Sequence, residues 1–203
     1  MNKMKIVSCY YENLKDTNVP LYQKKVFDKF NINLEQHCIS SRHSSFIDEV
    51  LRKDDSDIYC FFDVDCIPLV PNFIDIALDR LFSKQHSILG IEQQCNCNDS
   101  NNFIYCGPAC FLITNETYNI LGKPSAKETY RADVIGEFTY SALEKNVDTL
   151  YFKKTSSENN LWKLGENDFF GHGTIYENIL YHQFEISTNI DKFINKCVEV
   201  INE

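Results

Sequence analysis

The strongest constraint on the fold is an alternation, along much of the chain, of strand-length apolar runs with segments of helical period. Residues 5–11 are rich in β-branched and aromatic side chains, and a segment with helically spaced apolar residues follows them. The same succession recurs at 34–40 and 57–69. Strands that alternate with helices form a mostly parallel sheet with helices packed on it. The sequence therefore predicts an α/β fold, a Rossmann-like α/β/α sandwich formed as a single domain over residues 1–203.

Turn residues and apolar spacing also predict where individual elements begin and end. Ser45 and Asp48 have the spacing of a capping box, so we expect a helix to begin at Ser44 or Ser45. A Gly-Pro pair at 107–108 interrupts the apolar segment 103–114, which we interpret as a strand pair with a tight bend. Further strands are expected at 87–92, 149–154 and 178–186, and further helices at 72–84, at 133–147 and in a C-terminal segment that carries Ile190 and Ile201.

The net charge limits the partners that the chain can hold. Lys and Arg number 20 against 29 Asp and Glu, which gives a charge of -9 at pH 7. A protein that binds a phosphate backbone needs a broad basic face, so we expect no nucleic acid partner. An acidic chain can still bind an anionic small molecule when a divalent cation lies between its carboxylates and the phosphates.

Nothing in the sequence directs the chain into or across a membrane. The first residues contain neither the apolar core nor the small-residue cleavage site of a secretion signal. No run approaches the ~18 consecutive apolar residues of a membrane-spanning helix. The nine cysteines are odd in number, which favours reduced thiols. We therefore expect no membrane span and a cytoplasmic location.

Four of the cysteines form one close cluster. Cys95, Cys97, Cys106 and Cys110 follow the pattern C-x-C-x8-C-x3-C. Such a cluster can bind zinc, although the usual zinc motifs have paired C-x2-C spacing. The alternative is a set of buried or loop thiols without a metal. The sequence leaves both interpretations open.

Two aspartates at the end of an apolar run are the most specific chemical signal in the chain. Asp63 and Asp65 follow five apolar residues, and side chains two apart on a strand point to the same face. Carboxylate oxygens at the carboxyl end of a strand suit Mg²⁺ or Mn²⁺ bridging to a nucleotide diphosphate. The alternative is a solvated junction in which the aspartates only cap the loop. Carboxylates beside apolar neighbours cost several kcal/mol unless a positive group compensates, which favours the metal.

This pattern resembles the nucleotide-sugar glycosyltransferases of the GT-A fold. An apolar strand that ends in Asp-x-Asp about sixty residues into the chain is typical of them, and residues 5–186 can be laid onto their plan. The resemblance implies that Asp65 binds Mn²⁺ or Mg²⁺ directly, and that Asp63 contacts the metal through water or contacts the donor ribose. It also implies a histidine ligand after a late strand, either His182 or its rival His172. For each histidine the alternative is a structural, hydrogen-bonded side chain.

The resemblance further implies contacts to the donor. The first strand of these enzymes lies against the nucleotide base, which makes Ser8, Tyr10 and Tyr11 candidate contacts. The turn at Gly107 resembles the segment beneath the donor sugar, where the absence of a side chain lets the backbone approach the substrate. The alternatives are plain packing for the tyrosines and a tight bend for the glycine.

An acidic residue at the start of a late helix serves as the general base in inverting members of the family. Glu137 is the candidate by match, with Asp133 as the second choice, because the family's following aspartate is absent here. A carboxylate at a helix start is also stabilised by the helix dipole alone. Lys123, Lys127 and Arg131 lie just before this helix, where they contact donor phosphate or form a solvated loop. Inverting and retaining outcomes both remain open.

The function expected from these features is transfer of a sugar from a nucleoside-diphosphate donor, with a UDP-sugar as the expected donor, to an acceptor hydroxyl. The alternative is a catalytically inactive relative that binds a sugar, a nucleotide or a partner protein. A nucleotidyltransferase would need a glycine-rich phosphate loop with an arginine just after the first strand, and residues 10–20 contain no glycine. A P-loop kinase is excluded because no G-x4-G-K-[ST] motif is present.

Overall fold

A computed structural model describes residues 3–53, 55–95 and 103–203, and its centre is a six-stranded sheet in the order β2-β1-β3-β6-β5-β7. The strands are parallel except β6, which runs antiparallel to both of its neighbours. The prediction of an α/β fold with a mostly parallel sheet is confirmed. The strands are β1 (Met4–Tyr11), β2 (Glu35–Ile39), β3 (Ile58–Asp63), β5 (Ser87–Gln94), β6 (Ile104–Thr114) and β7 (Asp148–Phe152).

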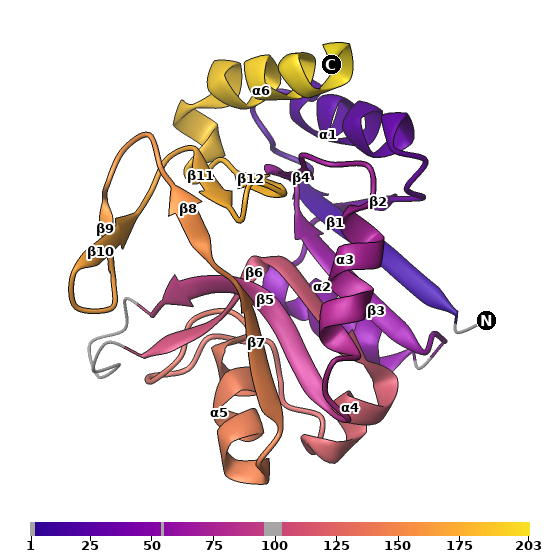
Figure 1. Ribbon diagram of the computed structural model, residues 1–203. Coiled ribbons are helices and arrows are strands. Elements are labelled where there is room, and N and C mark those ends of the chain that lie inside the picture. Colours follow the sequence, from indigo (N-terminus) through magenta and orange to yellow (C-terminus); the bar gives the residue numbers. More distant parts are fainter. Residues whose placement is uncertain (1–2, 54, 96–102) are drawn as a thin grey trace.

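Helices cover both faces of this sheet, which makes the sandwich (Figure 1). One face packs against α1 (Asn18–Lys29), α3 (Phe73–Leu81) and α6 (Ile190–Asn202). The other packs against α2 (His43–Arg52), α4 (Asn115–Ile120) and α5 (Gly136–Lys145). None of the helices in the described part of the chain has the length and apolar character needed to cross a bilayer.

Strand β3 shows why its sequence is apolar throughout. Cys60 and Phe62 belong to the core under α1 and α3, whereas Tyr59 and Phe61 belong to the core under α2 and α5. Because successive side chains point to opposite faces, every side chain of a strand that is covered on both sides is buried, which favours apolar residues at each position. The first charged side chain of β3, Asp63, stands where the strand leaves the sheet.

A second, antiparallel sheet lies beside the carboxyl end of β3, in the order β4-β12-β11-β8. The apolar segment predicted as a strand over 57–69 is in fact divided, because the chain leaves the central sheet at Asp63 and enters the small sheet at Cys66. The strand expected at 178–186 covers only three residues. The small sheet comprises β4 (Cys66–Pro68), β8 (Lys154–Ser156), β11 (Thr174–Tyr176) and β12 (Leu180–His182).

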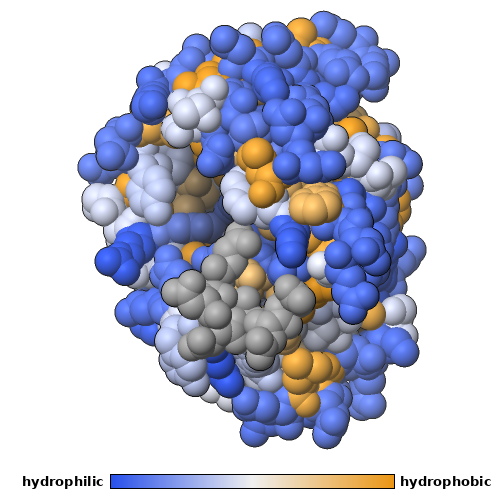
Figure 2. All heavy atoms as spheres, turned by 90° about the vertical axis from the view of Figure 1, so that its left-hand side faces the viewer, coloured by the Kyte–Doolittle hydropathy of each residue, from blue (hydrophilic) through white to orange (hydrophobic). Residues whose placement is uncertain are grey.

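A two-stranded hairpin of β9 (Trp162–Leu164) and β10 (Asp168–Phe170) extends from the same side of the molecule. Figure 2 shows this side with a mainly hydrophilic surface, on which hydrophobic residues form small separate groups. Lys154 of β8 binds Asp168 of β10 through an ion pair, and Gly165 donates its N–H to the Gln94 side chain at 2.7 Å. These contacts join the hairpin to both sheets.

Strand β6 is continuous but irregular. Gly90 of β5 stands opposite Phe111, while the next residue, Ile91, stands opposite Gly107. The three residues 108–110 of β6 therefore bulge out of the ladder with β5, while Cys110 stays paired with Phe62 of β3. The strand pair predicted for 103–114 is wrong, because the Gly-Pro pair produces a bulge within one strand and not a reversal of the chain.

The capping box predicted at Ser45 is also wrong. Helix α2 begins at His43, two residues earlier, and its first turn has no side-chain cap. Asp48 instead lies on the buried side of the helix, where its carboxylate accepts hydrogen bonds from Ser125 Oγ and the Ala126 N–H, both at 2.7 Å. A local capping pattern was overridden because this buried carboxylate anchors a distant loop.

Candidate functional site

The turn between β3 and β4 brings the two aspartates to a histidine from a distant part of the sequence. Asp63 ends β3, Asp65 lies in the turn, and β4 begins at Cys66. His182 is paired with Cys66 across the β12–β4 ladder, so it stands beside the turn. Ligand atoms of Asp63, Asp65 and His182 all lie within 4.8 Å of one another, and His182 Nε2 is 3.3 Å from Asp65 Oδ1.

The carboxylates of this turn lack a fixed cation. Among the residues that the structure describes, no Lys or Arg forms an ion pair with Asp63 or Asp65. Burial raises the pKa of Asp63 and the nearby Asp65 raises it further, while His43 and His182 oppose this. His43 Nε2 is 3.3 Å from Asp63 Oδ1. Two carboxylates face each other here with only imidazoles for compensation.

The donor set fits a divalent ion. Two carboxylates supply hard oxygen ligands, and an imidazole is compatible with Mn²⁺ and other first-row metals. His182 is 4% exposed, and its Nδ1 is buried without a hydrogen-bond partner among the described residues. Among the described residues Nδ1 thus has no hydrogen bond that would anchor the ring as a structural histidine, and leaving it unsatisfied costs about 1–3 kcal/mol.

A cavity of about 210 Å³ opens beside the turn and runs along the carboxyl end of β1. Both predicted tyrosines line it, and the Tyr11 hydroxyl accepts a hydrogen bond from the His43 N–H at 3.2 Å. Tyr11 is 46% exposed, so its ring is available to a ligand. The lining comprises Cys9, Tyr10, Tyr11, Leu14, Ile39, His43, Asp63, Val64, Asp65 and Ile186.

The other two candidate donor contacts lie off this lining. Ser8 is 1% exposed and sits deeper in β1, opposite Phe62, with its hydroxyl buried and unpaired in the described structure. Gly107 stands at the bulge of β6, where an added Cβ would come within 2.5 Å of Gln93 Oε1. The absence of a side chain at Gly107 is thus required by packing within the sheet.

The two candidate bases occupy different surroundings. Glu137 is held at the start of α5 by Arg131, whose Nε and Nη2 donate to the two carboxylate oxygens at 3.0 and 2.7 Å, and by the Thr129 hydroxyl at 2.7 Å. The Arg131 guanidinium lowers the pKa of Glu137. Within the described residues, the Asp133 side chain accepts a single hydrogen bond, from the Val134 N–H at 3.0 Å. Neither carboxylate lines the cavity.

The rival histidine and the basic segment are also placed. His172 Nε2 lies 2.8 Å from Glu185 Oε2, and it is outside the group of three ligands. Lys123 and Lys127 are exposed, whereas Arg131 is occupied by Glu137. The structure therefore brings His182, and not His172, to the aspartates.

The cysteine cluster does not converge within the described residues. Cys106 belongs to the core under α2 and α5, whereas Cys110 lies on the opposite face of the sheet. Burial raises the pKa of both thiols. Cys95 is buried, with its Sγ 3.9 Å from the carbonyl oxygen of Arg131, and Cys97 lies outside the described residues.

His43 is a site residue that the sequence reasoning missed. It follows β2 and opens α2, and its ring and its N–H contact Asp63 and Tyr11 respectively. A usable signal was present, because β1, β2 and β3 are parallel and their carboxyl ends share one edge of the sheet. Polar residues shortly after each of these strands are therefore candidates for one site.

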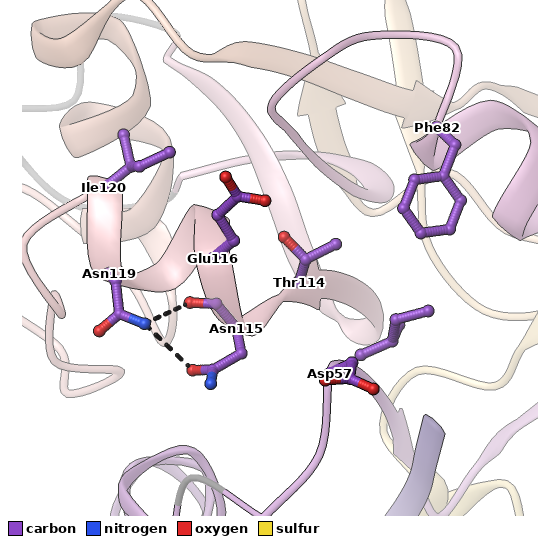
Figure 3. A pocket seen from close by; sticks show the side chains of 8 residues that line it. Asp57, Phe82, Thr114, Asn115, Glu116, Asn119 and Ile120 are labelled. Atoms are coloured by element: carbon purple, nitrogen blue, oxygen red, sulfur yellow. Dashed lines mark hydrogen bonds between the residues drawn. The ribbon is translucent and has the colours of Figure 1, made fainter. Parts of the chain in front are cut away.

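A larger cavity, of about 560 Å³, lies at the opposite end of β3 (Figure 3). Some of its polar groups already have partners within the chain. Asn119 Nδ2 donates to the carbonyl oxygen and to Oδ1 of Asn115, and Asp57 accepts from the Lys3 N–H at 2.7 Å. Its lining has no histidine or cysteine and no metal-binding group of three. The lining residues are Asp57, Ile58, Phe82, Thr114, Asn115, Glu116, Asn119 and Ile120. The candidate site is therefore the smaller cavity at the Asp63 turn, which lies beside the possible metal ligands.

Comparison with known proteins agrees with this fold. A Drosophila β1,4-galactosyltransferase 7, solved as a mutant with manganese, UDP-Gal and xylobiose, is 15% identical, with a TM-score of 0.50 over 93% of this chain and 74% of that one. A CMP:2-keto-3-deoxy-manno-octonic acid synthetase solved with CTP is 8% identical, with a TM-score of 0.52 over 97% and 99% of the two chains. No protein-family model matches the sequence, and no curated protein does so. The chain has the fold that GT-A nucleotide-sugar transferases and nucleotidyltransferases share, and the predicted resemblance is confirmed at that level.

Proposed function

We propose that this protein is a metal-dependent glycosyltransferase that moves a sugar from a nucleoside-diphosphate donor, a UDP-sugar, to an acceptor hydroxyl. The observation that carries the proposal is the convergence of Asp63, Asp65 and His182 within 4.8 Å beside a cavity at the carboxyl end of β1. Ligands of open α/β sheets bind at this edge. The similar galactosyltransferase was solved with manganese and UDP-Gal, which supports the same donor chemistry here.

Each candidate residue has a part in this proposal. Asp65 and His182 would hold Mn²⁺ or Mg²⁺. Asp63 would contact the ion through water, or would contact the donor ribose. When bound, the ion offsets the negative charge that builds on the diphosphate as the sugar departs. Tyr10 and Tyr11 line the space for the nucleotide base, with Ser8 behind them in β1.

On the sugar side, the proposed contact beneath the donor is the backbone at Gly107, which lies outside the cavity lining. An inverting reaction needs a base for the acceptor hydroxyl. Asp133 suits that role better than Glu137, because Arg131 lowers the pKa of Glu137 and occupies both of its oxygens. The xylobiose bound by the similar galactosyltransferase supports a saccharide as the acceptor.

Nucleotidyl transfer is the nearest competing reaction, since a CTP-binding synthetase has the same fold. That chemistry uses a glycine-rich, arginine-containing phosphate loop after the first strand. The corresponding residues 12–17 contain neither glycine nor arginine. Glycosyl transfer is therefore the better assignment.

Thermal denaturation with UDP, with Mn²⁺ and with both ligands tests the proposal. A ligand that binds only the folded state stabilises it by RT ln(1+[L]/Kd), which is about 2.7 kcal/mol at 100-fold saturation. We expect this shift only when UDP and Mn²⁺ are both present, and we expect Asp65→Ala to abolish it. GDP and CDP with Mn²⁺ test the base preference.

Turnover is then measured as UDP released from UDP-sugars in the presence of saccharide acceptors. Release that depends on an acceptor supports transfer. The absence of a shift with every nucleoside diphosphate and metal would instead favour an inactive relative that binds a sugar or a partner protein.

A further inference from the structure

A buried glutamine spans the two ends of the metal-site turn. Gln23 of α1 is 0% exposed, and its Nε2 donates to the carbonyl oxygen of Asp63 at 2.7 Å and to that of Cys66 at 3.0 Å. An amide nitrogen carries two hydrogens, so both are used. Helix α1 lies over β4 (Figure 1), which places this side chain directly against the turn.

The amide is held in one orientation. Gln36 of β2 donates from Nε2 to Gln23 Oε1 at 2.9 Å and to the carbonyl oxygen of Pro20 at 2.8 Å. Because Gln36 offers a donor, the oxygen of Gln23 must face it, and the nitrogen of Gln23 must face the turn. Both amide hydrogens and the oxygen of the buried Gln23 side chain are therefore bonded, which gives it a defined geometry.

The turn has little else to fix it. Only Val64 and Asp65 separate the last residue of β3 from the first of β4. The carbonyl oxygen of Asp65 accepts from the Gln183 N–H at 2.9 Å, so the carbonyls of Asp63, Asp65 and Cys66 each have a donor. Two of these three bonds come from Gln23. A metal site requires its ligands to be held to within about 0.5 Å.

We propose that Gln23 is a positioning residue for the metal site, fixing the backbone of the turn so that the Asp63 and Asp65 carboxylates meet beside His182 before any ion binds. This inference rests on the proposed metal site, and it predicts that Gln23 sets the affinity for the ion without touching it. Partners outside the ligand shell typically change metal affinity by about 10–100-fold when they are removed.

Mn²⁺ binding to the full chain, measured by calorimetry on the metal-free protein, tests the proposal. Gln23→Met keeps the length and most of the volume of the side chain but removes both donors. We expect Mn²⁺ affinity to fall by about 10–100-fold. Gln36→Leu leaves Gln23 in place without its orienting bond, and a smaller loss in the same direction is expected.

The matched control is Gln94→Met. Gln94 is also a buried glutamine, and it accepts the Gly165 N–H in the turn between β9 and β10, away from the Asp63 turn. Thermal denaturation reports the stability cost of each variant. A structural role alone would lower the melting temperature of Gln23→Met and Gln94→Met alike and leave Mn²⁺ affinity unchanged in both.

The outcomes separate the two proposals. If the wild-type protein binds no Mn²⁺, the metal site itself is wrong. If the wild type binds and Gln23→Met binds within threefold of it, the positioning role is overturned while the proposed function stands. Should Gln23→Met fail to fold, Gln36→Leu decides, and an unchanged affinity in that variant overturns the role of Gln23.

Discussion

The turn at Asp63 and the start of α5 at Glu137 are both acidic, and they differ in the source of the compensating charge. Glu137 is neutralised within the chain by Arg131, which lowers its pKa. Among the described residues, the ion-pair partners of Asp63 and Asp65 are His43 and His182, and burial raises the pKa of Asp63. The charge of Glu137 is thus balanced within the chain, whereas the carboxylates of the Asp63 turn can still be balanced by an added cation.

This difference teaches which carboxylates to associate with ligands. Both regions carry acidic residues at the boundary of an element, and local sequence does not show which of these carboxylates has a basic partner in the fold. A bidentate arginine marks a carboxylate whose interactions are already satisfied. Two close carboxylates without such a partner mark a place where added positive charge is favourable.

The largest expected effect comes from Asp65→Asn. We expect the affinity for UDP in the presence of Mn²⁺ to fall by more than about 100-fold, because even changes outside the ligand shell cost 10–100-fold. The metal-free variant should be no less stable than the wild type, since one of two mutually repelling charges is gone. Calorimetric titration and urea unfolding measure the two quantities. A UDP affinity of Asp65→Asn within threefold of the wild-type value would contradict the claim that the Asp63 turn, unlike the start of α5, binds a cation.

Glu137→Gln should show the reverse pattern. Loss of the charged hydrogen bonds to Arg131 and Thr129 should cost about 1–2 kcal/mol of the free energy of unfolding at pH 7, with UDP and Mn²⁺ affinity unchanged. The folded-state pKa of Glu137 is lowered, so its contribution is present above the ordinary value of 4.5 and is lost as the pH falls through the folded value. Urea unfolding at several pH values should show the wild type and the variant converging in acid. A constant difference across that range would contradict the ion pair as its cause.

Fluorescence can locate the ion in one region or the other. Trp162 is the single tryptophan, and its ring centroid lies 5.3 Å from that of Phe184, which in turn lies 3.9 Å from that of His182. Paramagnetic Mn²⁺ at the Asp63 turn should partly quench this fluorescence, and Mg²⁺ should not. Asp65→Asn should remove the effect, while Glu137→Gln should retain it. Quenching that survives Asp65→Asn would place the ion elsewhere.

The smallest expected effect comes from an exposed ion pair outside both regions. Lys192 and Glu158 form an ion pair at 2.9 Å with both side chains about half exposed. Lys192→Met should change the free energy of unfolding by no more than about 0.5 kcal/mol, because solvent screens exposed pairs. If Lys192→Met lowered the free energy of unfolding as much as Glu137→Gln does, the more buried, bidentate Arg131–Glu137 pair would not be the more stabilising of the two ion pairs.

The parts of the fold that depend on local pattern were predictable. The apolar run of β3 and the same-face spacing of Asp63 and Asp65 follow from the two-residue period of a strand, and both are observed. His182 was identified by resemblance and by its place on a late strand. Its convergence with the aspartates depends on the pairing of β12 with β4, which no local pattern encodes.

The features that were missed depend on long-range contacts. Asp48 looks like a helix cap in sequence, but it is bonded to a loop nearly eighty residues away. Gln23 looks like a polar position on a surface helix, yet it is buried against the turn. In each case a buried polar group had to find its partners, and only the tertiary structure shows where those partners are.

The division of the segment 57–69 between two sheets has a consequence for local unfolding. Asp63 belongs to the central sheet and His182 to the small one, so an ion held by both would link two units that are otherwise joined at this point by Val64 and Asp65. Regions that open independently exchange their amide hydrogens independently. With Mn²⁺ and UDP bound, the amide hydrogens of β4 and β12 should therefore exchange more slowly than in the ligand-free protein. Those of β7, at the far edge of the central sheet, should keep their original exchange rates.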